Sequence, residues 1–285
     1  MTDTPAPFAP LDDLAVLRWY EVAGVDECVG ETPVDRFAAD AARAAAARAQ
    51  PRDAPRPRTP PHPPPAVPRA AEGSAADPAA PAAAAARESA AAVAGRAETL
   101  DALRAALEAF DGCALKVTAT TTVFGEGAAD AALMVVGEAP GADEDRQGRP
   151  FCGVSGRLLD EMLASIGFDR STAYITNVVP WRPPGNRKPT PAEVATCTPF
   201  IERHVALIAP RALLLVGGLA ASTLIGTTEG ITRLRGHWRT HRTPGDAPDV
   251  PAMPTFHPAY LLRNAEAKRL AWRDLLAVKA RLAEG

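Results

Sequence analysis

Four short apolar runs, separated by stretches of helical spacing, constrain the fold of this 285-residue chain more than any other feature. The runs cover residues 132–137, 173–179, 212–217 and 253–257. Apolar positions recur at helical spacing in residues 155–166, 191–208, 218–225 and 266–283, and Ser155 is placed to cap the first of these helices. Buried strands that alternate with helices are typical of a mostly parallel sheet covered on both faces. We therefore expect an α/β fold, a three-layer αβα sandwich with a central four-stranded, mostly parallel sheet.

The first third of the chain differs in composition from the rest. Residues 51–70 are rich in proline and residues 71–95 are mostly alanine, so this part has few large side chains with which to build a core. We expect residues 45–95 to form a disordered Pro/Ala-rich linker, and residues 96–285 to form the folded domain. Residues 1–44 would be an N-terminal segment whose short amphipathic helix, within residues 10–37, either docks on a protein partner or folds back onto the domain.

Charge, hydropathy and cysteine spacing argue against a polycationic protein, a membrane-spanning or secreted protein, and a protein with a CxxC metal site. The net charge is −3, so any contact with nucleic acid must come from a local basic patch. No run of about 18 strongly apolar residues occurs, and the N-terminus lacks the basic start and apolar core of a signal peptide. The four cysteines form no CxxC pair. We expect a cytoplasmic, monomeric protein that does not associate with membranes.

The loops after the apolar runs are the first place to look for a site, because ligands of parallel sheets bind beyond the carboxyl ends of the strands. A glycine- and proline-containing turn at residues 137–141 follows the first run and can present backbone amides to a ligand. Phe151, further along, can stack on a planar group. Asn177 lies near the end of the second run, and its amide both donates and accepts hydrogen bonds. Since His257 ends the fourth run, these residues predict a pocket for a planar polar group.

A basic rim is expected around this pocket. Five basic residues would form this rim and contact phosphates: Arg182, Arg187, Lys188, Arg235 and Arg263. Ser155 would contact phosphate as well. A planar group carried on a phosphate backbone is best explained as a base flipped out of DNA.

Three segments carry a resemblance to a known family. GEAPGADEDRQGRPFCGVSGRLL, YITNVVPWRPPGNRKPTPAE and TFHPAYLLR, in this order, are similar to motifs of the family 4 uracil-DNA glycosylases. The similarity extends from about residue 110 to the C-terminus. It implies a monofunctional N-glycosyl hydrolase of base excision repair, which flips uracil out of DNA, hydrolyses the N-glycosidic bond and leaves an abasic site. A bacterial-type enzyme of this kind would be cytoplasmic and associated with the nucleoid when it acts on DNA.

The resemblance also implies a role for each residue of the predicted pocket. Glu144 would fill the space near uracil C5 and so reject thymine, and Phe151 would stack on the base. Asn177 would bind the polar edge of uracil, and His257 would donate a hydrogen bond to O2 as negative charge develops on the leaving base. Five consecutive turn residues would line the uracil site and help to place the attacking water: Gly137, Glu138, Ala139, Pro140 and Gly141. We expect His257 and Asn177 to contribute more to catalysis than Glu138 or Glu144.

The sequence departs from this family at its metal site. Family members usually hold a [4Fe-4S] cluster on four cysteines, and the corresponding positions here are Phe110, Cys113, Trp181 and Cys197. A cubane cluster needs a ligand, usually a thiolate, at each iron. We therefore expect no cluster and no other cofactor, with Phe110 and Trp181 filling the volume of the cluster by apolar packing.

Three alternatives remain open at this point. One is a glycosylase with broader specificity for deaminated bases. Another is a DNA-damage-binding or crosslinking protein with reduced catalysis, which is disfavoured because GNRKPTPAE leads straight into a predicted helix with no inserted basic segment and no histidine. The third places the main function in the N-terminal segment, as a tethered peptide that binds a partner.

Overall fold

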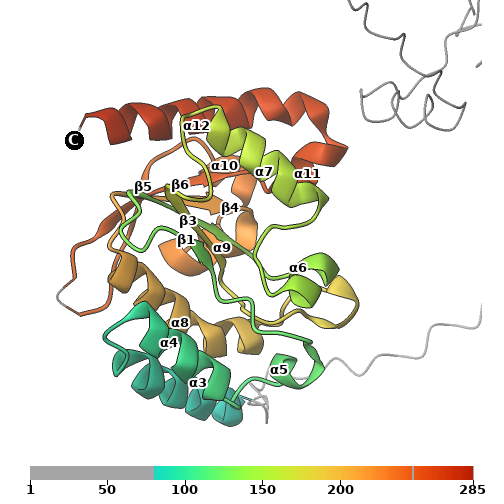
Figure 1. Cartoon of the computed structure of the whole chain (residues 1–285), viewed down its shortest axis with the longest axis vertical. Coiled ribbons are helices and arrows are strands. Elements are labelled where there is room, and N and C mark those ends of the chain that lie inside the picture. The colour runs from blue at the N-terminus through green and yellow to red at the C-terminus, as the bar shows by residue number, and fades with distance from the viewer. Residues whose placement is uncertain (1–79, 246, 285) are drawn as a thin grey trace, which may run out of the picture. The chain divides into compact units, whose positions relative to one another are not determined.

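Six strands of the described residues, 80–245 and 247–284, form one sheet in this computed structural model (Figure 1). They are β1 (Glu126–Gly127), β2 (Leu133–Gly137), β3 (Ala173–Asn177), β4 (Ala212–Val216), β5 (Arg239–His241) and β6 (Val250–Thr255). Their order across the sheet is β1-β3-β2-β4-β6-β5. The inner strands β3, β2, β4 and β6 overlap the four predicted runs and pair in parallel, whereas β1 and β5 pair antiparallel at the two edges.

The predicted α/β class is confirmed, but the predicted sheet of four strands lacks the two edge strands. β1 has two residues and β5 has three, which is too short for a hydrophobic period to be visible in the sequence. Each of them covers one edge of the parallel sheet, where unpaired backbone groups would otherwise be open to another chain.

Helices cover both faces of this sheet (Figure 1). On one face lie α3 (Ala80–Gly95), α4 (Leu100–Ala109), α8 (Pro191–Ile208) and α9 (Gly218–Ile225), and on the other lie α7 (Val154–Ala164), α11 (Pro258–Arg263) and α12 (Lys268–Ala283). Shorter elements are α5 (Leu115–Thr118), α6 (Ala142–Gln147), α10 (Ile231–Leu234), η1 (Pro184–Asn186) and η2 (Ala265–Ala267). Successive strand residues point to opposite faces, so β2 buries Met134 and Val136 against the first group of helices and Leu133 and Val135 against the second.

The sequence TPAE determines where α8 begins. Thr190 caps the helix because its Oγ1 accepts a hydrogen bond from Glu193 N at 3.3 Å, and Glu193 Oε2 accepts one from Thr190 N at 2.7 Å. Pro191 takes the first helical position, where its missing N–H group is not needed. This capping box ends the basic loop that follows β3 and so fixes the C-terminal end of that loop.

Helix α3 corrects the predicted boundary between linker and domain. The composition predicts disorder up to residue 95, but residues 80–95 form a helix that packs against α8. Ala90 and Ala94 are buried in this contact, because small side chains allow two helices to approach closely. The folded domain therefore includes residues 80–95, whereas the rest of the predicted linker and the predicted docking helix lie outside the described residues.

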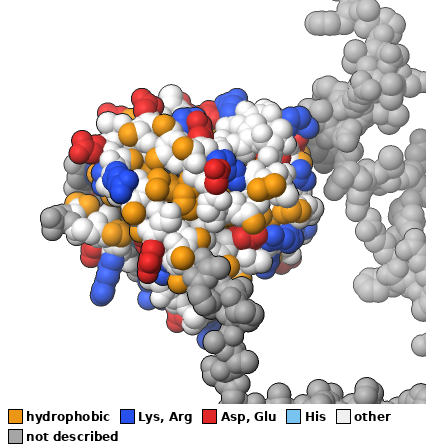
Figure 2. Space-filling model, turned by 90° about the horizontal axis from the view of Figure 1, so that it is seen from below, with side chains coloured by type: hydrophobic (Ala, Val, Ile, Leu, Met, Phe, Trp, Pro, Cys, Tyr) orange, Lys and Arg blue, Asp and Glu red, His pale blue; other side chains and the backbone are white. Residues whose placement is uncertain are grey.

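The surface of the domain carries charges of both signs. Seen from the side of α3, α4 and α5, hydrophobic, basic and acidic side chains are interspersed (Figure 2). Among the described residues, no helix is both long and apolar enough to cross a membrane.

A buried histidine on the α8 side of the sheet is expected to make the domain sensitive to acid. The His204 ring stacks on Phe124 at 4.4 Å between centroids, and its Nε2 lies 2.8 Å from the Tyr174 hydroxyl. Burial lowers the pKa of His204 from 6.5 to about 3, and the charge of Arg104 acts in the same direction. The imidazole is therefore neutral in the folded protein, whereas in the unfolded chain it binds a proton as the pH falls below its ordinary pKa.

The contribution of His204 to stability is complete above its unfolded pKa of 6.5 and is lost as the pH falls toward its folded pKa of about 3. In that window each pH unit lowers the free energy of unfolding by up to about 1.4 kcal/mol. Urea titrations at a series of pH values should show this slope in the natural protein and a smaller slope in His204→Phe, which has no titrating group at this position. Equal slopes in the two proteins would contradict the prediction.

Candidate active site

A cavity of about 520 Å³ opens at the carboxyl ends of β2, β3 and β6, and it has the size of a small-molecule site. The predicted site residues that line it are Glu138, Ala139, Pro140, Gly141, Glu144, Phe151, Ser155, Asn177, Arg187, Lys188, His257 and Arg263. Segments that are more than one hundred residues apart in sequence meet here, because the parallel strands deliver their following loops to one edge of the sheet.

Gly137, the last residue of β2, allows the aromatic and amide groups of the cavity to converge. The Phe151 ring is 5% exposed and lies with its centroid 5.6 Å from that of His257, at an interplanar angle of 29°. A Cβ atom at position 137 would lie 2.5 Å from Phe151 Cζ and would also overlap Asn177 Oδ1. Only a residue without a side chain fits between these groups.

The Asn177 side chain presents an acceptor that the protein does not satisfy. The residue is 5% exposed at the end of β3, and within the described residues its buried Oδ1 has no hydrogen-bond partner. A buried polar atom without a partner typically destabilises the protein by about 1–3 kcal/mol, and most such atoms are paired. Because Asn177 lines the cavity, a ligand with an N–H donor would complete this site.

His257 carries its proton on the nitrogen that is free to bind a ligand. The residue caps α11, and its Nδ1 accepts a hydrogen bond from Ala259 N at 3.1 Å. Burial lowers the pKa of His257 from 6.5 to about 4; the charge of Arg263 adds to this effect and Glu144 opposes it. The imidazole is thus neutral at pH 7, and with Nδ1 acting as acceptor the proton is on Nε2. His257 can therefore act as a neutral hydrogen-bond donor.

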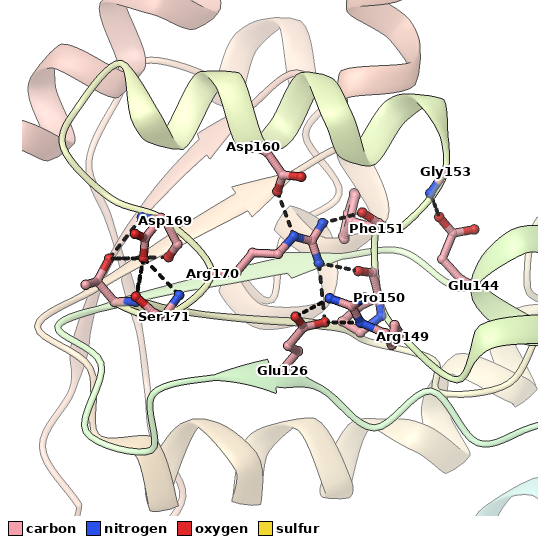
Figure 3. A network of polar contacts seen from close by, with 11 residues as sticks. Glu126, Glu144, Arg149, Pro150, Phe151, Gly153, Asp160, Asp169, Arg170 and Ser171 are labelled. Carbon is pink, nitrogen blue, oxygen red and sulfur yellow. Dashed lines mark hydrogen bonds and ion pairs between the residues drawn. The ribbon is translucent and has the colours of Figure 1, made fainter.

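Glu144 connects the two loops that form one wall of the cavity. Its Oε2 accepts from Gly141 N at 3.1 Å and its Oε1 accepts from Gly153 N at 2.9 Å, the second bond being visible in Figure 3. With both oxygens bound to backbone, this side chain holds the turn after β2 against the start of α7. The N-cap of α7 is Gly153, since the helix begins at Val154, so the prediction that Ser155 caps this helix is wrong.

Glu138 is the second carboxylate in the cavity. Burial raises the pKa of its carboxyl group, and the nearby positive charge of Lys188 opposes that shift. A carboxylate with a raised pKa is a stronger base and accepts a hydrogen bond from water more readily.

The structure brings part of the predicted basic rim to the cavity. Lys188 and Arg263 line it and are exposed. Arg187 also lines it, but both of its terminal nitrogens donate to the Glu193 carboxylate, at 2.8 and 2.6 Å. Arg182 is not a lining residue, and its Nε donates to Asn186 Oδ1 at 2.7 Å, so it supports the loop after β3.

The prediction that Arg235 contacts phosphate needs correction. Its guanidinium forms a two-pronged ion pair with Asp274 of α12, and it also donates to Leu270 O at 2.8 Å. Asp274 accepts a further hydrogen bond from Thr255 Oγ1 at 2.7 Å. The Arg235 side chain is only 14% exposed and is bound to α12, so it is not available to DNA, whereas Asp274 joins α12 to β6 through Thr255. Nothing in the sequence distinguishes this buried arginine from those at the rim.

Four lining residues are not among those that the sequence predicts: Pro183, Asn186, Ala259 and Tyr260. Tyr260 lies in α11, is 39% exposed and forms part of the cavity mouth. Asn186 follows Gly185 in the basic loop and has a left-handed backbone conformation with φ of 54°. The segment TFHPAYLLR contains Tyr260, and the position of this residue three after a strand-end histidine was the available signal.

The four positions at which the resemblance implies cluster ligands do meet in the core, but their side chains do not fit an iron–sulfur cluster. Phe110, Cys113, Trp181 and Cys197 are all buried in one hydrophobic group. The Trp181 side chain is 1% exposed, and its Nε1 donates to Thr122 Oγ1 at 3.0 Å. The Phe110 ring packs edge-on against Phe200 at 5.1 Å.

Two thiols remain at this place. Interaction with the Cys197 side chain lowers the pKa of Cys113, whereas interaction with Cys113 and burial raise the pKa of Cys197. A cubane needs four ligands, and two of the positions here hold aromatic rings. Across the described part of the chain, no three Cys, His, Asp or Glu side chains are grouped so that they could hold a metal ion.

Comparison with known proteins gives a consistent result. The sequence model of the family described as "Uracil DNA glycosylase superfamily" matches residues 124–276. A curated protein of Thermotoga maritima named "Type-4 uracil-DNA glycosylase" is 37% identical over 191 residues, which are 65% of this chain and 95% of that protein.

Two other relatives are also named as uracil-DNA glycosylases, one of type 4 and one of type 5. The protein of the same name from Archaeoglobus fulgidus is 38% identical over 175 residues, which are 60% of this chain and 87% of the relative. A "Type-5 uracil-DNA glycosylase" of Pyrobaculum aerophilum is 30% identical over 169 residues, which are 54% of this chain and 72% of the relative. The chain therefore belongs to the uracil-DNA glycosylase superfamily and, within it, to the type-4 family.

Proposed function

We propose that this protein removes uracil from DNA by hydrolysis of the N-glycosidic bond, releasing free uracil and leaving an abasic site for base excision repair. The observation that carries the proposal is the unsatisfied, buried Oδ1 of Asn177 at the end of β3. It needs a donor from the ligand, and the N3–H group of uracil supplies one. Cytosine has an acceptor at N3 and would leave Asn177 Oδ1 unpaired, which a buried site disfavours strongly.

The remaining cavity groups suit a pyrimidine held beside Asn177. The Phe151 ring offers an apolar face on which the base stacks, with an expected contribution of about 1–3 kcal/mol for a base on an aromatic side chain. When Asn177 Oδ1 accepts from N3–H, its amide nitrogen is placed to donate to the adjacent carbonyl oxygen of uracil. The exposed basic side chains Lys188 and Arg263 then contact the phosphates that flank the flipped nucleotide.

Bond cleavage leaves negative charge on the departing uracil and positive charge on the sugar. His257 stabilises the leaving base through the Nε2–H donor that its contact with Ala259 defines. A neutral donor holds the base as an anion without transferring a proton to it. Glu138, with its raised carboxyl pKa, is the group that orients the attacking water, and Glu144 holds the wall of the cavity in place.

Uracil release from oligonucleotides tests the function. Single- and double-stranded substrates with one U, T, hypoxanthine or xanthine should show cleavage at U after alkaline treatment of the abasic site. Asn177→Ala should lose most of this activity, because the base then has no partner for its polar edge. Lack of uracil release by the natural protein would refute the function, and release of hypoxanthine at a comparable rate would establish the broader specificity instead.

We also propose that the protein folds and acts without an iron–sulfur cluster. The support is the packing of Phe110 and Trp181 at two of the four cluster positions, with the Trp181 indole hydrogen-bonded to Thr122. Because the indole occupies a buried volume, Trp181→Ala should lower the free energy of unfolding by about 3–5 kcal/mol. Chemical denaturation measures this loss.

Iron and sulfide analysis of protein purified without oxygen tests the absence of the cluster directly. We expect no stoichiometric iron and no absorption near 400 nm in the natural protein. Four iron atoms per chain would overturn the proposal.

Thr122→Val is the matched control for Trp181→Ala, since it removes the hydrogen bond and keeps the ring. Its loss of stability should be about 1 kcal/mol.

A further inference from the structure

Phe151, the ring on which the base would stack, has a backbone conformation that a bulky residue disfavours. Its φ is 51°, in the left-handed region, and such conformations are less stable by about 1–3 kcal/mol for residues other than glycine. They persist only where the surrounding structure holds them. The position of the ring therefore depends on contacts made by the backbone of residues 150–151.

Two features hold this backbone in place. First, α7 packs directly against it, since a Cβ atom at Gly156 would overlap the carbonyl oxygen of Phe151. Second, Arg170 donates from Nη2 to the same oxygen and from Nη1 to Pro150 O at 3.0 Å. One planar guanidinium thus fixes two consecutive carbonyl groups.

Arg170 is itself held in place by two carboxylates. It lies between α7 and β3, and its Nε donates to Asp160 of α7 at 2.8 Å. Its Nη1 is 3.4 Å from Glu126 Oε2 on β1, and Figure 3 shows the guanidinium between these acids and the two carbonyls. The side chain is 20% exposed, so these charge-assisted bonds are partly shielded from water.

We propose that Arg170 is a positioning residue, which holds the Phe151 ring in the orientation that stacks on the base. The proposal rests on the function proposed above. Arg170 does not line the cavity, so its effect on the reaction passes through residues 150–151. A flexible lysine with a single ammonium group cannot contact two carbonyls and two carboxylates at once, whereas the planar fork of arginine can.

The first test is the rate of uracil release in Arg170→Gln under single-turnover conditions. We expect the maximal rate to fall by about 10- to 100-fold, because a shift of about 1 Å in a positioning group can reduce a rate by about 100-fold. The DNA concentration for half-maximal rate should change less than the rate, since Lys188 and Arg263 are untouched. Arg170→Lys should recover only part of the loss.

Arg149→Gln is the matched control. Arg149 binds the same carboxylate as Arg170, with bonds of 3.0 and 2.6 Å to Glu126, but contacts neither carbonyl of residues 150–151. It should retain the natural rate. An equal loss in Arg149→Gln would show that the ion pairs of Glu126, and not the carbonyl contacts, matter, and would overturn the proposal.

A double-mutant cycle distinguishes positioning from general stability. If Arg170 acts through the ring, Arg170→Gln should cause no further loss of rate once Phe151→Leu has removed that ring. If the fold-loss of rate in the double variant equals the product of the two single fold-losses, Arg170 acts by another route and the proposal is refuted.

A spectroscopic readout keeps this inference separate from the proposed function. Protein labelled with 4-fluorophenylalanine has eight fluorinated rings, and the ¹⁹F resonance of Phe151 is the one absent from Phe151→Leu. Arg170→Gln should shift or broaden this resonance in the free protein, and Arg149→Gln should leave it in place. If no uracil is released by the natural protein, the function fails but this measurement still decides on Arg170. An unchanged Phe151 resonance in Arg170→Gln would refute the positioning role.

Discussion

His257→Ala is expected to lower the single-turnover rate of uracil release by about 100- to 1,000-fold, the loss that follows removal of one preorganised donor to a developing anion. The neutral imidazole presents its Nε2–H group because Nδ1 is engaged with Ala259 N. Among the described residues, no other histidine lines the cavity and could replace this donor. Quenched-flow measurement with a single-stranded substrate separates the chemical step from product release.

Two further variants show whether the loss comes from the donor or from the helix cap. His257→Asn retains a side-chain oxygen that can accept from Ala259 N and cap α11, but it has no group at the position of Nε2. It should be as slow as His257→Ala while unfolding at nearly the natural temperature. His237→Ala changes an exposed histidine outside the cavity and should react at the natural rate. A His257→Asn rate within about tenfold of the natural one would rule out the donor role.

The pH dependence gives an independent check on the state of His257. Burial lowers its pKa to about 4 from the ordinary 6.5, so the ring stays neutral throughout the neutral range. The rate should therefore show no loss of activity centred near pH 6.5, and any acid limb should appear at lower pH.

Gly137→Ala is the second change with a large expected effect. The added methyl group would lie 2.5 Å from Phe151 Cζ and against Asn177 Oδ1, so both groups that would contact the base must move. We expect the rate to fall by about 100-fold or more, since about 1 Å of misplacement has this effect. The free energy of unfolding should fall by about 1–3 kcal/mol, as is usual for overpacking.

Gly95→Ala is the matched control for this substitution, because a Cβ atom there meets nothing within 4 Å. It should keep both the rate and the stability of the natural protein. A Gly137→Ala protein that releases uracil at the natural rate would show that the cavity tolerates a displaced ring, and would contradict tight packing of Phe151 and Asn177 against position 137.

The strands and main helices could be predicted from the sequence because they are long enough to show a period. The apolar runs at residues 132–137 and 212–217 correspond to β2 and β4, and the segment that begins with TPAE corresponds to α8 over the same residues, 191–208. Helix α3 could not be predicted, because its stability comes from alanines packed on α8 and not from an amphipathic pattern.

The site residues at the ends of strands can also be predicted from the sequence. The sequence predicts Asn177 and His257 at one edge because each lies at or just beyond the end of a parallel strand, and the structure brings both to the cavity. The sequence predicts Arg182 and Arg235 at the rim because their charge alone gives no information about their partners. Their bonds to Asn186 and Asp274 depend on contacts between separate elements.

The α/β architecture and the edge of the sheet that carries the site can be predicted from the amino-acid sequence, which also has Phe110 and Trp181 where the family resemblance implies cluster cysteines. Each of these depends on local pattern or on residue identity. The availability of side chains for chemistry depends instead on tertiary contacts: the unpaired Oδ1 of Asn177, the proton on His257 Nε2, and the hydrogen bond from Arg170 to Phe151 O. Hydrogen-bond pairing and desolvation depend on residues that are distant in the chain, and these become neighbours only when the sheet and its loops are assembled.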